Sequence, residues 1–328
     1  MTNPDFPDLP GFTYVEDLQD GFLGRTAILQ KLSFNDHTKL VCKCIDCQRL
    51  GNKEQQNKFI DTLKSISLIR SIHFLPYSEV IVRDNHIFLI RPYLELSTLE
   101  ELVLNDENPN MNEYFVLWKT IVHAFRNIHA MDIAPCFIRP NNIFISANGK
   151  PIITDIYPPI FDAARPQSSK DLIFLAPEFL QGSKQIGKPA DVWSLGLLLL
   201  FMITGEVPWD IHNLIRMMRN MMKGYEGISI EIPEQLKPII EATVIVDPDK
   251  RVPITTLSTF DPKVSDIVRG GNKIKPKINV QQSVLMKNSI VSQPKTKLHK
   301  GNINQRQSLA TIPSVPSFLR ESFASGLT

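Results

Sequence analysis

Cysteine is scarce in this chain of 328 residues, and long apolar runs are missing. Four cysteines do not form a disulfide framework, and Cys44-x-x-Cys47 has neither a second cysteine pair nor a nearby histidine, which argues against a zinc site. No apolar run reaches the roughly 18–20 residues that span a bilayer. The N-terminus also lacks the basic flank and apolar stretch of a secretory signal. We therefore expect a protein of the reducing cytoplasm without a transmembrane segment.

The net charge of +2 conceals a strong asymmetry along the chain. From Arg269 to the end, ten Lys and Arg residues stand against one acid, Glu321, so this part carries +9 and the preceding part −7. Ser, Gln and Asn are abundant in it, and its apolar residues show little periodicity. Such a composition cannot bury enough surface to offset the entropy of ordering. We predict a basic, Ser/Lys-rich disordered tail over residues 263–328, either simply solvated or in contact with acidic protein, lipid or nucleic acid.

Hydrophobic periodicity divides the remaining chain into two parts. The first part alternates short strands with one helix over 53–72, whose apolar residues recur at helical spacing and are joined by Leu68 and Ile72. From Leu99 onward the pattern is helical: Tyr114–His129 is amphipathic, and Val192–Thr204 is so apolar that a buried helix is predicted. The predicted strands are Thr26–Leu32, Leu40–Ile45, Ser78–Val82 and His86–Ile90.

Five ordered landmarks resemble those of a eukaryotic-type protein kinase domain over roughly 12–260. Leu40–Ile45 is similar to the V-A-I-K strand, and Asp155-Ile156-Tyr157 stands where D-F-G is expected, 13 residues after Asn142. Ala176-Pro177-Glu178 matches A-P-E, and two later segments resemble the family's D-x-W-S-x-G and its late arginine: Asp191–Gly196 and Asp247–Arg251.

The resemblance implies an α+β, bilobal kinase-like fold. A flexible N-terminus (1–10) would precede the kinase-like domain (11–262), with a β-rich lobe of one helix (11–93) and a larger, mainly helical lobe (94–262). The tail (263–328) would follow.

Several positions that the family uses to bind nucleotide or to hold the fold are retained. Lys43 matches the phosphate-binding lysine, and Asn142 and Asp155 match the residues that hold Mg²⁺, so the resemblance leaves binding of ATP and Mg²⁺ open. Glu178 and Arg251 would form a buried ion pair. Asp191 would hold the backbone of the catalytic loop by charge-assisted hydrogen bonds.

The catalytic loop has lost its acid. In H-R-D-L-x-x-x-N the Asp serves as the base, and its position is occupied by Phe137. General-base catalysis contributes about 10²–10⁴ in rate, and a phenyl ring cannot accept a proton. Cys136 replaces the neighbouring arginine, and Arg139 takes the position of the catalytic-loop lysine. We expect no catalytic residue at these positions.

The glycine-rich loop is reduced as well. Aligned on G-x-G-x-x-G-x-V, the chain reads Gln19, Gly21, Gly24 and Thr26, so two of the three glycines remain. The alternative is that this G-x-x-G is only a turn.

The helix over 53–72 lacks the glutamate that pairs with Lys43 in the family. Ser65 takes that position, and Asp61, one turn earlier, is the candidate substitute.

Around the adenine site, the residues of this chain are larger than those usual in the family, or charged. Arg91 falls at the gatekeeper position, with Pro92 and Leu94 in the hinge. A buried guanidinium needs a charged partner, for which Asp155 is the candidate. A one-residue slip would instead make Ile90 the gatekeeper. Two further positions would narrow the pocket: Val41 at the usual alanine site and Phe144 beneath the base.

Around the activation segment, Tyr157 in place of the glycine, followed by Pro158 and Pro159, would stiffen the turn after Asp155. We also hypothesise an ion pair between Arg139 and Asp171 that closes this segment; the alternative is chance placement of two surface charges.

These features favour a pseudokinase: a catalytically impaired kinase-like protein that acts as a signalling scaffold or allosteric binding partner, for example of another kinase. One alternative is an active ATP-dependent serine/threonine kinase with an unorthodox catalytic loop, because phosphoryl transfer depends mostly on positioning. The other is a switch that binds ATP without turning it over.

Overall fold

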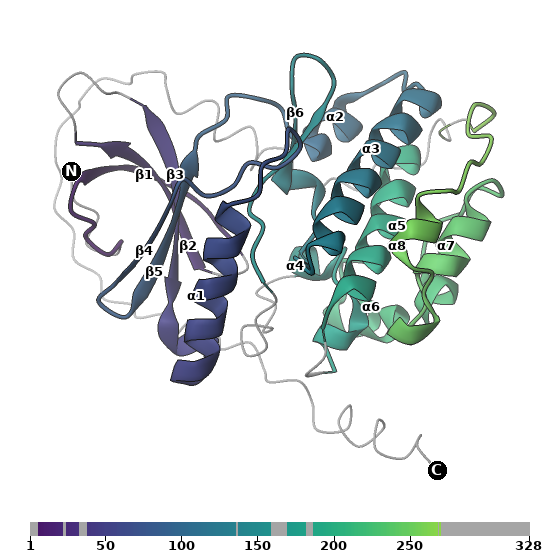
Figure 1. Ribbon diagram of the computed structural model, residues 1–328. Coiled ribbons are helices and arrows are strands. Elements are labelled where there is room, and N and C mark those ends of the chain that lie inside the picture. Colours follow the sequence, from purple (N-terminus) through teal and green to yellow (C-terminus); the bar gives the residue numbers. More distant parts are fainter. Residues whose placement is uncertain are drawn as a thin grey trace, which may run out of the picture. The chain divides into compact units, whose positions relative to one another are not determined.

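The computed structural model describes residues 6–21, 24–32, 38–135, 137–158, 169–181, 186–267 and 269. Figure 1 gives the arrangement of the elements in this part of the chain. Within it, no helix is long and apolar enough to cross a membrane.

The first part folds into one antiparallel sheet of five strands in the order β1-β2-β3-β5-β4. The four strands that the sequence predicts are confirmed with ends shifted by one or two residues, and β1 precedes them. The strands are β1 (Phe12–Gly21), β2 (Gly24–Lys31), β3 (Lys39–Asp46), β4 (Glu79–Arg83) and β5 (His86–Pro92).

Helix α1 (Lys53–Ser67) connects β3 to β4 and begins with a capping box, in which Asn52 and Gln55 bond each other's backbone N–H. It ends five residues earlier than the periodicity predicts. Leu68 and Ile72 therefore lie beyond the helix and are 71% and 74% exposed, so the prediction that they widen its buried face is wrong.

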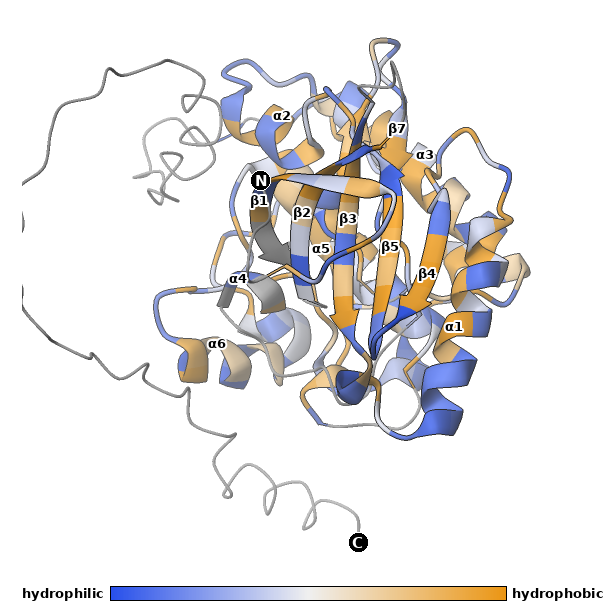
Figure 2. Cartoon of the chain, turned by 90° about the vertical axis from the view of Figure 1, so that its left-hand side faces the viewer, coloured by the Kyte–Doolittle hydropathy of each residue, from blue (hydrophilic) through white to orange (hydrophobic). Residues whose placement is uncertain are grey.

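The two faces of the sheet carry different side chains, because successive side chains of a strand point to opposite sides. Val41 and Lys43 of β3 share the inner face with Arg91, which pairs with Val41 in register on β5. The outer face is apolar, and in Figure 2 β3 and β5 carry mainly hydrophobic residues. We define the outer face by Ala27, Leu29, Leu40, Cys42, Cys44, Phe88 and Ile90.

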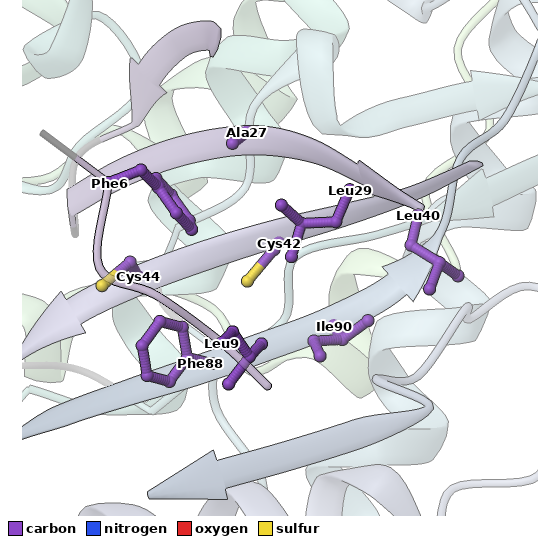
Figure 3. Packing of buried hydrophobic residues seen from close by; sticks show 9 residues of the cluster. All are labelled: Phe6, Leu9, Ala27, Leu29, Leu40, Cys42, Cys44, Phe88 and Ile90. Carbon is purple, nitrogen blue, oxygen red and sulfur yellow. The ribbon is translucent and has the colours of Figure 1, made fainter. Parts of the chain in front are cut away.

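Residues 6–10 cover this outer face, which differs from the prediction of a flexible N-terminus. Figure 3 shows Phe6 and Leu9 over the strands that carry the other seven residues of the cluster. Phe6 and Leu9 are only 7% and 5% exposed. The stretch is ordered because two large apolar side chains are removed from water, each contributing about 1.5–3 kcal/mol.

The second part is helical, as predicted, and is built around α5 (Lys188–Thr204), in which every residue from Ala190 to Ile203 is buried. A Cβ on Gly196 would lie 2.0 Å from Thr243 Oγ1 of α7, so only glycine permits this close approach. The other helices are α2 (Leu99–Asn105), α3 (Met111–Ala130), α4 (Ser169–Leu172), α6 (Leu214–Met221), α7 (Lys237–Thr243) and α8 (Ile254–Leu257).

A short backbone ladder joins the two lobes. The small hairpin of β6 (Ile143–Ile145) and β7 (Pro151–Ile153) belongs to the helical lobe. Ile153 donates its N–H to His73 O at 2.7 Å and accepts from Leu75 N at 2.9 Å, so the loop after α1 pairs with β7. This ladder brings the end of β7, and with it Asp155, beneath the inner face of the sheet.

The helical lobe extends beyond residue 262, where the sequence predicts its end. Val264 is 1% exposed, and the Arg269 guanidinium donates to the carbonyls of Ile203, Met202 and Val103 at 2.9, 2.6 and 3.0 Å. The Arg269 guanidinium also lies 5.3 Å from the Tyr114 ring centroid. An arginine at carbonyls that have no partner inside their own helices adds a favourable contact at the helix C-termini. Residues 271–328, the greater part of the predicted tail, lie outside the described residues.

Candidate functional site

Two cations converge on one carboxylate between the lobes. Arg91 forms a two-pronged pair with Asp155, Nε to Oδ1 at 3.1 Å and Nη2 to Oδ2 at 3.0 Å. Lys43 Nζ lies 3.5 Å from Oδ1. The three side chains are only 7–8% exposed. The predicted pairing of Arg91 with Asp155 is confirmed.

The position of each group follows from local structure. Arg91 and Lys43 point to the same side because the ladder of β3 and β5 places them on the inner face. Asp155 follows β7 with a φ of 58°, a left-handed conformation that Asp tolerates better than most residues. That turn directs the carboxylate back toward the sheet. Lys43 therefore pairs with Asp155, and the expectation that Asp61 substitutes as its partner is wrong: Asp61 is exposed and pairs with Lys64 at 3.3 Å.

Both oxygens of Asp155 are engaged by cations of the protein. Oδ1 faces Arg91 Nε and Lys43 Nζ, while Oδ2 accepts from Arg91 Nη2. The Thr154 hydroxyl lies 3.4 Å from Oδ2, but its single proton has a closer acceptor in Asn142 O at 3.1 Å. Magnesium requires near-ideal octahedral coordination by oxygen, so a metal ion at Asp155 would have to displace at least one of these cationic contacts.

The charges in the cluster change one another's pKa. Burial alone would raise the pKa of Asp155, but Lys43 and Arg91 hold it below its ordinary value, so the carboxylate stays ionised. Burial lowers the pKa of Lys43, and Arg91 adds to this effect, while Asp155 opposes it. For Arg91 burial also favours the neutral form, yet the Asp155 carboxylate outweighs it and the pKa rises. The cluster carries two cations against one anion.

Phe137 forms an aromatic cluster where the family has its catalytic acid. Its ring centroid lies 5.0 Å from that of Tyr157 and 5.1 Å from that of Phe179. Lys43 Nζ lies 5.5 Å from the centroid of Tyr157. Phe137 and Tyr157 are 5% and 2% exposed. The cluster thus joins the loop before Asn142 to the segment after Asp155 and to the A-P-E segment, as packing core.

A small cavity lies on the catalytic-loop side of these groups. It is bordered by Phe137, Arg139, Asn142 and Asp155 and has a volume of about 10 Å³. A volume of about 10–15 Å³ holds one water molecule. Arg139 is partly buried and Asn142 half-buried at its edge.

Arg91 also occupies the region predicted for the adenine. Its Cζ lies 5.8 Å from the Phe144 ring centroid, and its Nη1 donates to Pro92 O at 3.2 Å. Val41 is 3% exposed on the same face of the sheet, and Leu94 is half-buried in the segment after β5. The arginine therefore fills space between the sheet and Phe144.

Gly24 has a packing role of its own. A Cβ at this position would lie 2.1 Å from the Cys44 carbonyl oxygen, which no side chain tolerates. Gly21 pairs with Gly24 in the β1–β2 ladder. The glycine at position 24 is thus required by packing, whether or not a phosphate is bound.

One architectural contact matches its prediction. Arg251 binds Glu178 through two N–H groups, with 2.8 Å from Nη1 to Oε1 and from Nη2 to Oε2, and both side chains are buried. Asp191 is fully buried and pairs with His129 Nε2 at 2.8 Å, while its hydrogen bonds to the catalytic-loop backbone stay a prediction. His129 was not foreseen at this site, although its place on the buried face of α3 was a signal.

Tyr77 is a second residue that sequence reasoning missed. Its hydroxyl is buried without a hydrogen-bond partner among the described residues. Burial, followed by the charges of Asp155 and Tyr157, raises the pKa of Tyr77 well above its ordinary value. Cys136, Pro159 and the side chain of Asp171 lie outside the described residues, so the Arg139–Asp171 hypothesis stays a prediction.

A five-stranded sheet with one connecting helix, a helical lobe and a lysine–aspartate pair between them define the bilobal protein kinase fold. A family model described as the protein kinase domain matches residues 21–260. The chain belongs to the protein kinase domain family.

Curated relatives are also kinases. Maternal embryonic leucine zipper kinase of Xenopus tropicalis is 27% identical over 233 residues, which cover 67% of this chain and 34% of that protein. Carbon catabolite-derepressing protein kinase of Secale cereale is 23% identical over 257 residues, covering 74% of this chain and 51% of that protein. This chain thus spans between a third and about half of the length of these relatives.

Among solved structures, a crystal structure of Rad53 1-466 in complex with AMP-PNP aligns with a TM-score of 0.59 at 16% identity. The alignment covers 76% of this chain and 64% of that one. At this identity the likeness establishes the fold alone.

Proposed function

We propose that this chain is a catalytically impaired protein kinase-like domain that acts by binding other proteins. The observation that carries the proposal is the buried bidentate pair between Arg91 and Asp155. An internal cation occupies the carboxylate that would hold the metal.

Two steps of phosphoryl transfer lack the protein groups that normally carry them out. Metal ions normally neutralise charge on the transferred phosphate, and both oxygens of Asp155 already bind cations of the protein. A base normally takes the proton of the substrate hydroxyl, and Phe137 instead packs against Tyr157 and Phe179. Reaching an active geometry would require breaking both the ion pair and the aromatic cluster.

A second function, an ATP-binding switch without turnover, is favoured by the charge of the site. Lys43 and Arg91 together exceed Asp155 by one positive charge. A buried unpaired charge is costly, and a phosphate group would neutralise it. Such a ligand would bind without a metal ion. The third reading, an active serine/threonine kinase, draws on the retained Lys43, Asn142 and Asp155 and on the relatives that are kinases.

Partners follow from the same proposal. We propose protein partners, among them another kinase, and a second contact of the basic tail with acidic protein, lipid or nucleic acid. A cytoplasmic location fits these partners.

A thermal-shift titration of the full chain separates the readings. A ligand at 100 times its Kd stabilises by about 2.7 kcal/mol. We expect no shift with millimolar ATP and Mg²⁺, and no transfer of labelled γ-phosphate to the chain or to a generic protein substrate. An equal shift in Mg²⁺ and in EDTA would establish the switch. A Mg²⁺-dependent shift that Lys43→Ala and Asp155→Ala abolish, together with transfer, would refute the proposal.

A further inference from the structure

The segment that covers the outer face of the sheet has an internal repeat. Proline recurs at every third position, and the third residue of each triplet is apolar: Pro4-Asp5-Phe6, Pro7-Asp8-Leu9 and Pro10-Gly11-Phe12. Up to Leu9 the repeat has the three-residue period of a polyproline II helix. At Pro10-Gly11 the chain turns, because Gly11 has a φ of 89° and Leu9 O accepts from Phe12 N, and Phe12 begins β1.

The exposure of the described residues follows this period of three. Phe6 and Leu9 are buried, whereas Asp8 and Pro10 are exposed. Phe12 is half-buried and packs against the same cluster. The Phe6 ring centroid lies 6.5 Å from that of Phe88 and 6.1 Å from that of Tyr14. One stripe of the segment therefore contacts the sheet and the other side faces solvent.

The segment is held by its side chains and hardly by its backbone. Among the described residues, the only backbone hydrogen bond of residues 6–10 joins Leu9 O to Phe12 N, inside the segment itself. Pro7 and Pro10 have no N–H to donate. Residues 6–10 do not extend the sheet as a further strand; they lie on the sheet as a proline-rich ligand lies on an apolar groove.

The surface beneath is wide and entirely apolar. Its seven side chains come from β2, β3 and β5, and none exceeds 9% exposure while the segment is in place. Two of them are the thiols of Cys42 and Cys44. Burial raises the pKa of the Cys44 thiol to about 12 and also raises that of Cys42. Removal of the segment would expose a hydrophobic patch and two titratable thiols together.

We propose that the outer face of the sheet is a docking site for a partner segment in which proline recurs every third residue after an apolar side chain. The chain's own residues 6–10 occupy this site and compete with the partner. The proposal rests on the proposed function in naming a surface for a binding module, but it does not depend on whether the active site turns over.

The test uses the full chain carrying Phe6→Ser and Leu9→Ser, and a fluorescent peptide with the sequence NPDFPDLPGF. The matched control is Asp8→Ser, which changes the exposed side of the same segment. If the segment occupies the face at least nine-tenths of the time, the apparent affinity of wild type is lowered by about tenfold or more. We expect the double variant to bind the peptide at least tenfold more tightly than wild type or Asp8→Ser. A peptide with serine at both apolar positions should not bind.

Thiol labelling reports the same event at the surface itself. With a maleimide, read by mass spectrometry at each cysteine, Cys42 and Cys44 should react faster in the double variant and be protected again by the peptide. Pro7→Gly with Pro10→Gly is a second variant, which loosens the segment while keeping its apolar side chains. It should show the same two changes to a smaller degree.

Three outcomes would overturn the proposal. One is a folded variant with reactive thiols that does not bind the peptide. Another is equal binding of the serine-substituted peptide. The third is a wild-type dimer that dissociates in the double variant, because the occupant would then be a second copy of this chain. A finding of phosphoryl transfer would refute the proposed function and leave these results unchanged.

Discussion

Replacement of Arg91 by methionine tests whether an internal cation holds the active site. Met conserves most of the apolar stem and volume but removes three N–H donors, two to Asp155 and one to Pro92 O. Loss of one partner of a buried ion pair costs about 3–5 kcal/mol. Because Lys43 remains 3.5 Å from Asp155, we expect the lower end, about 3 kcal/mol.

The assay is thermal and urea-induced unfolding of the full chain. For a domain of this size, 1 kcal/mol corresponds to about 2–4 °C in Tm, so Arg91→Met should lower Tm by about 6–12 °C. Arg83→Met is the matched control. Its pair with Asp84 is exposed, and such pairs contribute about 0–1 kcal/mol.

A double-mutant cycle isolates the pair. Asp155→Asn leaves Arg91 and Lys43 as neighbouring like charges and should cost about 5 kcal/mol. The double variant leaves only Lys43 beside a neutral amide, so its cost should fall below the sum by about 1–3 kcal/mol. Additive losses, or an Arg91→Met variant as stable as Arg83→Met, would refute the reasoning.

Four further predictions concern three other contacts and the pH dependence of the Asp155 cluster. Phe137→Asp should not restore transfer of the γ-phosphate, because Asp155 remains paired with Arg91. In urea unfolding it should destabilise the chain by about 3–5 kcal/mol, because it opens the aromatic cluster. Phe137→Leu is the control and should destabilise the chain much less. Glu178→Gln should cost about 3–5 kcal/mol in urea unfolding, and a loss below that of a surface substitution would contradict the buried pair. Arg269→Ala should cost about 1–3 kcal/mol, and hydrogen exchange should show faster opening at the end of α5. Folding lowers the pKa of Asp155, so the ionised carboxylate stabilises the folded state fully above about pH 4, the pKa of Asp in the unfolded chain. This stabilisation is lost as the pH falls toward the lower pKa of the folded state. Between about pH 4 and pH 2, wild type should therefore lose more stability than Asp155→Asn.

Spaced motifs and periodicity were sufficient for most of the fold. The strands around Lys43 and Arg91, the buried helix at Asp191 and the pair of Glu178 with Arg251 all follow from residues whose role is strongly constrained by burial. The partner of Arg91 could be foreseen as well, because a buried guanidinium needs an anion and few were available.

Other features depend on contacts that a linear pattern does not contain. The periodicity of α1 continues past Ser67, but the chain turns there to pair with β7, which leaves Leu68 exposed. The prediction of a flexible N-terminus over 1–10 takes no account of the proline repeat, and burial of Phe6 and Leu9 against the sheet is a contact that no helix or strand period indicates. Composition places Arg269 in a basic tail, since no sequence pattern reveals which arginine contacts the free carbonyls at helix ends.

The backbone ladder between the loop after α1 and β7 has a mechanical consequence. Since Ile153 bonds to both His73 and Leu75, the C-terminal end of α1 is tied to the helical lobe, while its N-terminal end is far from this tie. A helix of 15 residues is about 22 Å long. A tilt of about 10° at the tied end would move Lys53 by about 4 Å, following from that length. The helix is thus fixed at its C-terminal end, and small rearrangements near Asp155 would displace its N-terminal end the most.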